Sequence, residues 1–328
     1  MGVQWACNTC GTRRFARLLA LSKLSALPNP SSAAMNSPLA VPPGAASQVA
    51  STASTVSTAL ATPTAIAPSA ADLNELNRAF HADGYIVLRG FAPPAVCDQL
   101  EQVAREQLAA AAAPVEYEAE LGYPGAPASR DAAGGATVRR LRQAYGRDDA
   151  FRAWAADPAV TQVVATLLGE PVRLTLAHHN CVMTKHPHYG SQTGWHRDTR
   201  YWSFARPELV TVWLALGRED ESNGVLRVIP GSHTVALEPG QLDAAEFLVE
   251  SHPASQAMLQ GVRPLALERG DVLLFDSRLY HSAGRNVSEA VKLSVAFAYH
   301  GASNHPVPGT RSAEFGSVAL PAPATPAR

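Results

Sequence analysis

The sequence predicts an α+β protein in which helices come first and a mostly antiparallel β-sandwich or barrel follows. Two observations lead to this fold class. Apolar residues recur at helical spacing in several segments between residues 72 and 168. From residue 172 to residue 299, short segments of alternating polarity are separated by Gly, Pro and Asn, which is typical of strands joined by turns.

The first predicted helix begins near Asp72. Leu73, Leu76 and Phe80 lie three or four residues apart, as on one helix face, and Gly84 follows as a stop. The elements expected next are a strand over 85–90, a helix opened by Pro93 and Pro94, a long loop or lid over 109–136, and a helix over 148–168 that ends at Gly169.

Five strands are expected in the second part of the chain, over residues 173–184, 209–216, 225–229, 271–275 and 291–299. Side chains alternate between the two faces of a strand. In the last segment, one face would carry Lys292, Ser294, Ala296 and Ala298, and the other would carry the apolar residues Val291, Leu293, Val295 and Phe297. A cation and a hydroxyl beside two alanines predict a small polar slot rather than a filled core.

Both ends of the chain differ in composition from the middle. Residues 1–71 contain no Asp or Glu, and 34 of the 46 residues from Ser25 to Ala70 are Ala, Ser, Thr or Pro. This composition offers too little apolar bulk to offset the entropy of ordering. We therefore expect a disordered, low-complexity N-terminal extension over 1–71, a folded domain over 72–301, and a Pro/Ala-rich tail over 302–328 that trails over the surface.

Charge and composition exclude several classes of protein. With 27 basic and 28 acidic residues the net charge is −1, so nothing favours nucleic acid as a partner. No run approaches the ~20 apolar residues of a membrane span. Four scattered cysteines do not form a disulfide framework, which favours the reducing cytoplasm. The alternative location is an organelle, reached through the basic stretch Arg13–Leu24. Cys7 and Cys10 have no second cysteine pair nearby, and two ligands are too few for structural zinc.

One motif has the spacing of a metal site. His196 and Asp198 lie in Gly194-Trp-His-Arg-Asp198, and residues i and i+2 of an extended segment point to the same side. His281, which follows the expected strand 271–275, is the best candidate for a third ligand. Two imidazoles and one carboxylate form the facial triad of non-haem Fe(II) oxygenases, although zinc accepts the same ligands. The alternative is a hydrogen-bonded His–Asp pair at the surface.

Further motifs surround this triad in a characteristic order. They are Phe80-His-Ala-Asp-Gly-Tyr-Ile-Val-Leu-Arg-Gly-Phe91, Lys185-His-Pro-His188, Trp195-His-Arg-Asp198, Val212-Trp-Leu-Ala215, Asn223-Gly-Val-Leu-Arg-Val-Ile-Pro-Gly-Ser-His233, Gly270-Asp-Val-Leu-Leu-Phe275 and His281-Ser-Ala-Gly284. In order and spacing, the chain from Leu73 to Tyr299 resembles the phytanoyl-CoA dioxygenase (PhyH-like) family of Fe(II)/2-oxoglutarate-dependent oxygenases.

The resemblance implies a double-stranded β-helix (jelly-roll) core with flanking helices. It also implies iron held by His196, Asp198 and His281, with 2-oxoglutarate as cosubstrate and ascorbate as reductant. The reaction implied is hydroxylation of an unactivated C–H of a small-molecule substrate by O2, with succinate and CO2 as co-products. Relatives that halogenate replace the carboxylate with a small residue, so Asp198 favours hydroxylation.

The resemblance also suggests where 2-oxoglutarate binds. A buried carboxylate needs a cation, and the family usually places an arginine about eleven residues after the second histidine, where this chain has Lys292. Lysine cannot form the bidentate fork of arginine. We expect Lys292 and Ser294 to contact the cosubstrate, with Arg285 as a fallback cation; the alternative for Lys292 is a solvated edge-strand lysine. Lys185, Trp213 and Cys181 match family positions near the cosubstrate or lining the pocket.

Other residues near the motifs allow two interpretations. Tyr201, Trp202 and Phe204 would either wall the substrate cavity or belong to the core. The arginines at 139, 140 and 142 would either meet an anionic substrate group or lie on a solvated helix face. Two other functions stay open: a cupin-type metalloenzyme that does not use 2-oxoglutarate, and a non-catalytic module that binds 2-oxoglutarate or a metal.

Overall fold

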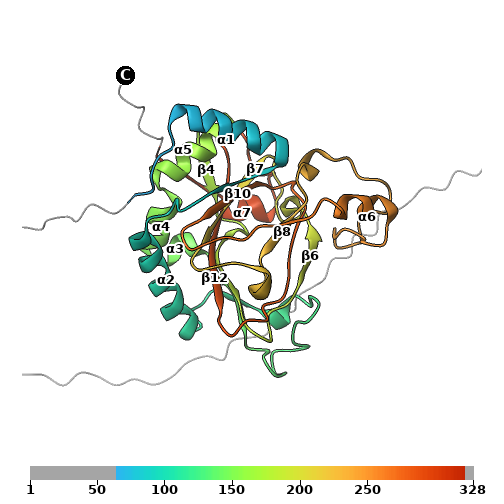
Figure 1. Cartoon of the computed structure of the whole chain (residues 1–328). Helices are drawn as coiled ribbons and strands as arrows, with labels where there is room; N and C mark the ends of the chain where they lie inside the picture. The colour runs from blue at the N-terminus through green and yellow to red at the C-terminus, as the bar shows by residue number, and fades with distance from the viewer. Residues whose placement is uncertain (1–63, 322–328) are drawn as a thin grey trace, which may run out of the picture. The chain divides into compact units, whose positions relative to one another are not determined.

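A computed structural model describes residues 64–321 of the chain. The expectations for Cys7, Cys10 and the basic stretch Arg13–Leu24 lie outside the described residues. The described part contains one helical layer and two antiparallel sheets (Figure 1). Among these residues, no helix combines the length and the apolar composition that a bilayer span requires.

The first helix starts slightly earlier than the sequence indicates. α1 (Ala70–Asp83) begins after Ser69, which forms a reciprocal capping box with Asp72, and Gly84 caps its end with a left-handed φ of 81°. Ala65 is already buried, and its N–H donates to Asp157 Oδ2 at 3.1 Å. Packed structure therefore begins before the expected boundary at Asp72.

The other helices follow in two groups. Before the central strands come α2 (Pro94–Ala109), α3 (Ala144–Arg147), α4 (Asp149–Ala155) and α5 (Pro158–Leu168), and later in the chain come α6 (Pro253–Leu259) and α7 (Arg311–Phe315). The single helix expected over 148–168 is interrupted, because Pro158 has no N–H to continue α4. Asp157 instead caps α5 by accepting from the N–H of Ala159 at 2.9 Å.

Nine strands form the larger sheet, in the order β1-β10-β7-β12-β5-β3-β2, with β4 paired to β12 and β13 paired to β4. They are β1 (Tyr85–Leu88), β2 (Val115–Tyr117), β3 (Val138–Arg142), β4 (Val172–Thr175), β5 (Asn180–Lys185), β7 (Leu209–Ala215), β10 (Val272–Asp276), β12 (Lys292–Gly301) and β13 (Ser317–Ala319). The expected strand 173–184 is thus two strands, separated by a turn at His178, whose φ is 58°.

The smaller sheet has the order β6-β11-β8-β9. Its strands are β6 (Thr193–His196), β11 (His281–Ala283), β8 (Leu226–Val228) and β9 (Arg263–Pro264). β6 and β11 pair directly, with the Cα of His281 opposite that of His196. This pairing brings together two of the three expected ligands, which lie far apart in the sequence.

Two apolar cores separate the layers. The first lies between the larger sheet and α1, α2, α4 and α5, which all cover the same side of the strands in Figure 1. It contains Leu293, Val295 and Phe297 of β12. The second core lies between the two sheets and includes Trp213, Phe275, Ala296, Leu226 and Val228. The alternation expected along β12 is therefore confirmed, and the two facing antiparallel sheets form the predicted jelly-roll core with flanking helices.

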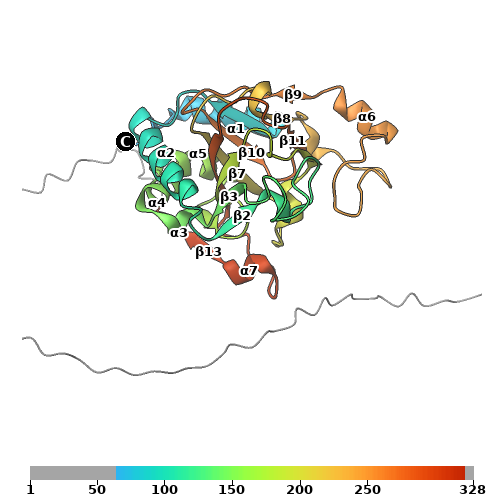
Figure 2. The ribbon, with the colours of Figure 1, turned by 90° about the horizontal axis from the view of Figure 1, so that it is seen from below.

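Two segments differ from expectation. Residues 302–328 were expected to form a surface tail, but residues 311–319 form α7 and β13, which lie at the lower edge of Figure 2. β13 is held because it adds to the edge of β4, with Val318 opposite Leu174. The loop expected over 109–136 also contains β2, which pairs with β3. Both short strands gain their hydrogen bonds from a neighbour far away in sequence, which periodicity within the segment does not reveal.

Candidate metal centre

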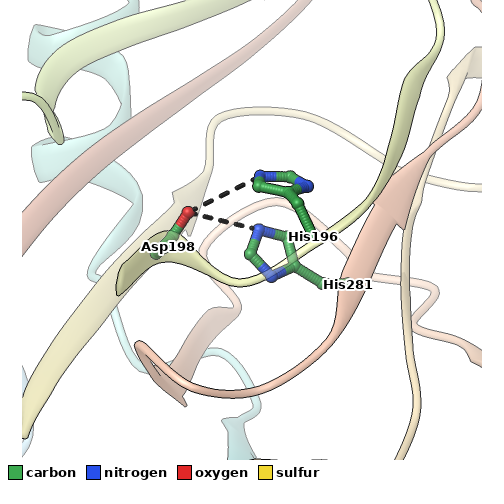
Figure 3. A group of neighbouring side chains, drawn as sticks. All are labelled: His196, Asp198 and His281. Atoms are coloured by element: carbon green, nitrogen blue, oxygen red, sulfur yellow. Dashed lines mark ion pairs between the residues drawn. The ribbon is translucent and has the colours of Figure 1, made fainter. Parts of the chain in front are cut away.

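His196, Asp198 and His281 converge at one end of the space between the sheets. His196 ends β6, Asp198 opens the short 3-10 helix η2 (Asp198–Tyr201), and His281 begins β11. Figure 3 shows both imidazoles directed at the carboxylate. Asp198 Oδ1 lies 3.7 Å from His196 Nε2 and 3.5 Å from His281 Nε2, and the three candidate ligand atoms lie within 4.8 Å of one another. The three side chains expected to hold a metal therefore lie together in the structure.

Hydrogen bonds to the backbone orient both imidazoles. His196 Nδ1 donates to the carbonyl of Gly194 at 2.9 Å, and His281 Nδ1 donates to the carbonyl of Leu279 at 3.0 Å. Because a carbonyl only accepts, each proton must be on Nδ1, and the lone pair on each Nε2 faces Asp198. Metal-binding histidines are commonly oriented in this way.

The two oxygens of Asp198 have different surroundings. Oδ2 lies 3.2 Å from Thr211 Oγ1 and 3.1 Å from His179 Nδ1. Oδ1 is buried and has no hydrogen-bond donor among the described residues, and the whole residue is 0% exposed. A buried anionic oxygen without a donor is unfavourable. A cation placed between this oxygen and the two Nε2 atoms would remove the cost, so the residues fit a divalent metal.

Protonation states support the same conclusion. Burial lowers the pKa of His196 well below its ordinary value, and the neighbouring His281 lowers it further. Burial alone would raise the pKa of Asp198, but His179 and His281 together hold it below the usual range. Neutral imidazoles and an ionised carboxylate are the forms that bind a metal.

A cavity opens beside the triad. Its lining includes the imidazoles of His196 and His281, the aromatic residues Trp213 and Phe275, and four cations, Arg139, Arg140, Lys185 and Lys292. The expectation that Lys292, Lys185 and Trp213 border one pocket with the ligands agrees with this geometry. Cys181 does not line this cavity but borders a neighbouring one.

Glu219 is a residue that the sequence reasoning missed. It is 0% exposed, and its carboxylate accepts from Lys292 Nζ at 2.8 Å, Ser294 Oγ at 2.6 Å and Trp213 Nε1 at 3.0 Å. The expected cosubstrate residues Lys292 and Ser294 are thus already bonded to a carboxylate of the protein itself. No spacing in the sequence marks it, because the chain bends at Leu216 and Gly217 after β7, and its partner Lys292 is 73 residues away.

Lys185 is the second lysine of the cavity. Its Nζ donates to the carbonyl of Gly284, and no carboxylate among the described residues lies within 4 Å of it. Burial lowers the pKa of Lys185 well below the ordinary lysine value, and the nearby charges of Lys292 and Arg139 lower it further. An incoming carboxylate would relieve this repulsion.

Arg285, the fallback cation, is placed elsewhere. Its side chain is exposed and donates to the backbone carbonyl of His188, and it does not line the cavity. It lies in the loop after β11, whose short pairing ends at Ala283. The structure therefore does not support Arg285 as an anchor for the cosubstrate.

Aromatic residues border the imidazole of His196. The ring centroids of Tyr201 and Phe247 lie 5.7 Å and 5.8 Å from it, both edge-to-face. Trp202 packs against His179 instead, and Phe204 packs against His300 away from the triad. Of the three aromatic residues considered from sequence, Tyr201 alone touches a ligand. Phe247 was missed because its loop carries no motif.

The arginines of segment 138–142 are not on a solvated helix face. They lie on strand β3, where Arg139 and Arg140 are buried. Arg139 Nη1 contacts Glu118 Oε2 at 3.1 Å and Ser191 Oγ at 2.6 Å, so its charge is balanced inside the protein. Arg140 Nε lies 3.3 Å from Glu116 Oε1. The alternation of β3 was obscured in the sequence by its three arginines.

Comparisons with known proteins agree with this geometry. The family model described as phytanoyl-CoA dioxygenase (PhyH) matches residues 80–294. Peroxisomal phytanoyl-CoA dioxygenase of Bos taurus is 26% identical over 175 residues, which cover 50% of this chain and 50% of the relative. Ectoine dioxygenase of Sphingopyxis alaskensis is 26% identical over 242 residues, which cover 69% and 75%. The chain spans about half the length of the phytanoyl-CoA dioxygenases that it matches.

A solved structure shows the same fold. EctD from S. alaskensis with 2-oxoglutarate and 5-hydroxyectoine matches with a TM-score of 0.61 and 24% identity. The match covers 78% of this chain and 86% of that chain. At this level of identity the likeness supports the jelly-roll arrangement of the two sheets.

Proposed function

The chain belongs to the phytanoyl-CoA dioxygenase family, and we propose that it is a non-haem Fe(II)/2-oxoglutarate-dependent dioxygenase. The observation that carries the proposal is the donor-free oxygen of Asp198 near the Nε2 atoms of His196 and His281. Its reaction is hydroxylation of an unactivated C–H of a small-molecule substrate by O2, with succinate and CO2 as co-products and ascorbate as reductant.

The triad would hold Fe(II) through His196, Asp198 and His281 and leave further positions open. The bound iron supplies the oxidative chemistry, and the protein supplies orientation and the exclusion of water. Thr211 and His179 both contact Oδ2 of Asp198, which leaves Oδ1 to face the metal position. Because Asp198 is present, the third protein position is filled by a carboxylate, which favours hydroxylation over halogenation.

For 2-oxoglutarate, the two lysines of the cavity are the candidate anchors. We assign the distal carboxylate to Lys185 and Lys292, which both line the cavity that holds the two histidines. Within residues 64–321, Lys185 has no carboxylate within 4 Å, whereas Lys292 is bonded to Glu219. In this assignment Ser294 and Trp213 act through Glu219, because both side chains donate hydrogen bonds to its carboxylate. The cosubstrate therefore competes with Glu219 for Lys292.

A second candidate function is favoured by that same ion pair. If Glu219 neutralises Lys292 permanently, the triad would serve a cupin-type metalloenzyme that does not use 2-oxoglutarate. The two candidates differ in one measurable product, because only the dioxygenase releases succinate from 2-oxoglutarate.

The deciding experiment measures succinate release in the presence of Fe(II), ascorbate and 2-oxoglutarate. A second experiment is an untargeted comparison of the metabolites oxidised by wild-type and by His196→Ala protein. We expect release by the wild type and none by His196→Ala or Asp198→Ala. A matched control is His81→Ala, an exposed helix residue outside the site. No succinate from iron-loaded wild type across broad substrate panels would reject the dioxygenase in favour of the cupin-type enzyme.

A further inference from the structure

A second cavity lies beside the metal cavity and shares one residue with it. Its lining includes Glu116, Arg140, Arg142, His178, Tyr201 and Arg311, and Arg140 also lines the metal cavity. The three arginines come from two distant segments, strand β3 and helix α7. Their convergence is a product of the tertiary structure alone.

The charges around this second cavity do not cancel. Three arginines face a single carboxylate, and that carboxylate, Glu116, lies 3.3 Å from Arg140 and 3.7 Å from Arg139. Within residues 64–321, neither Arg142 nor Arg311 has a carboxylate within 4 Å. The cavity therefore carries an excess of positive charge that no described residue neutralises.

Histidine and tyrosine side chains do not change this balance. Burial lowers the pKa of His178 well below its ordinary value, and the charges of His179 and Arg140 lower it further, so the imidazole is neutral. Tyr201 Oη shares a hydrogen bond with Tyr123 Oη at 3.4 Å, and a phenol is uncharged near neutral pH. Among the described residues that line this cavity, Glu116 is the one source of negative charge.

The wall between the two cavities is thin. The ring of Tyr201 stacks on His178 with centroids 3.7 Å apart, and the same tyrosine ring meets the imidazole of His196 at 5.7 Å. Arg140 Nη1 lies 3.3 Å from His178 Nε2, on the same wall. Residues of the two cavities are therefore in contact through Tyr201, and Arg140 lines both.

We propose that this cavity binds the anionic group of the substrate, a carboxylate or a phosphate. Arg140 forms its inner end, and Arg142 and Arg311 supply the uncompensated charge. Guanidinium groups recognise both kinds of oxyanion by paired N–H donors. The inference rests on the proposed function, because only an enzyme has a substrate. It assigns that substrate to the class of small organic acids or phosphate esters.

The test compares anion binding by metal-free wild type, by Arg142→Gln/Arg311→Gln and by a charge-matched control. The control is Arg78→Gln/Arg105→Gln, which removes two exposed arginines from α1 and α2. Inorganic phosphate and hexanoate are the probes, each titrated calorimetrically at low ionic strength. Near-ultraviolet circular dichroism checks that each protein is folded.

We expect wild type and control to bind the same probe equally, and the cavity variant to bind it at least tenfold more weakly. The probe that binds distinguishes a phosphate from a carboxylate. Equal affinity in all three proteins, or no binding of either probe by wild type, would overturn the inference.

A separate measurement distinguishes this failure from a failure of the proposed function. Wild type with Fe(II) and 2-oxoglutarate under anaerobic conditions should develop the visible charge-transfer absorption of the ternary complex. If that absorption appears while the anion affinities are equal, only the anion site is rejected. If it is absent while the cavity variant has lost anion binding, the anion site stands and the dioxygenase is rejected.

Discussion

The carboxylate of Glu219 lies 2.8 Å from Nζ of Lys292, and both side chains are buried between the two sheets. The residue that the sequence suggests as the anchor of 2-oxoglutarate is therefore already half of an internal ion pair. The carboxylate is also held by Ser294 and Trp213, so it is fixed in place before any ligand arrives. In the proposed assignment, the affinity for 2-oxoglutarate and the stability of the fold are coupled through this pair.

Glu219→Gln should strengthen 2-oxoglutarate binding, because it removes the competing charge and keeps the shape of the side chain. Charge-assisted hydrogen bonds contribute roughly 1.5–3 kcal/mol, so we expect the Kd to fall about tenfold or more. Anaerobic titration of the Fe(II) protein, followed by its charge-transfer absorption, measures the change. Glu221→Gln, an exposed neighbour, is the control. An unchanged Kd would place the distal carboxylate away from Lys292.

Removing the lysine of this ion pair should destabilise the fold. Lys292→Met leaves Glu219 charged and unpaired at a site that is 0% exposed, and such a change costs about 3–5 kcal/mol. The double variant Glu219→Gln/Lys292→Met removes both charges, so we expect it to recover most of the lost free energy of unfolding. Urea denaturation of both variants tests this. Equal stability of the two would show that the pair is effectively solvated.

Thr211→Val should weaken Fe(II) binding without removing a ligand. Thr211 Oγ1 contacts Asp198 Oδ2 at 3.2 Å, and valine keeps the volume but loses the donor. Loss of an outer-shell partner typically costs roughly 10–100-fold in metal affinity. Competition with a chromogenic chelator measures the Kd for Fe(II). Thr166→Val on α5, outside the site, should leave it unchanged, and equal affinities in all proteins would contradict the assigned role of Thr211.

The affinity for 2-oxoglutarate should fall as the pH rises through the pKa of Lys185. Burial lowers this pKa well below the ordinary lysine value of 10.5, so the ammonium loses its proton at a pH where other lysines keep theirs. Only the protonated form attracts a carboxylate, so binding is strongest on the acidic side of that pKa. Lys185→Met should bind more weakly and lose this pH dependence. Calorimetric titrations between about pH 6 and pH 10 test both expectations. A parallel decline in wild type and variant would exclude Lys185 as the source.

Local patterns in the sequence predicted the metal centre and one face of β12. His196 and Asp198 share a side because they are two residues apart in an extended segment, which is independent of the rest of the fold. The alternation from Val291 to Phe297 placed Lys292 between the sheets for the same reason. His281 was the best candidate for the third ligand because it follows the expected strand 271–275, and the family motifs agreed, but no local rule connects it to the other two ligands.

What occupies the space opposite these side chains was decided only by the tertiary structure. Lys292 meets Glu219 across 73 positions of sequence. Arg142 and Arg311 line one cavity because residues 311–315, which composition assigned to a loose tail, form a helix. Periodicity states which face of an element is buried, but it does not state which charge lies across from it, because that depends on how strands pair and layers pack. The ion pair in the cosubstrate cavity and the cationic cavity beside it follow from that packing.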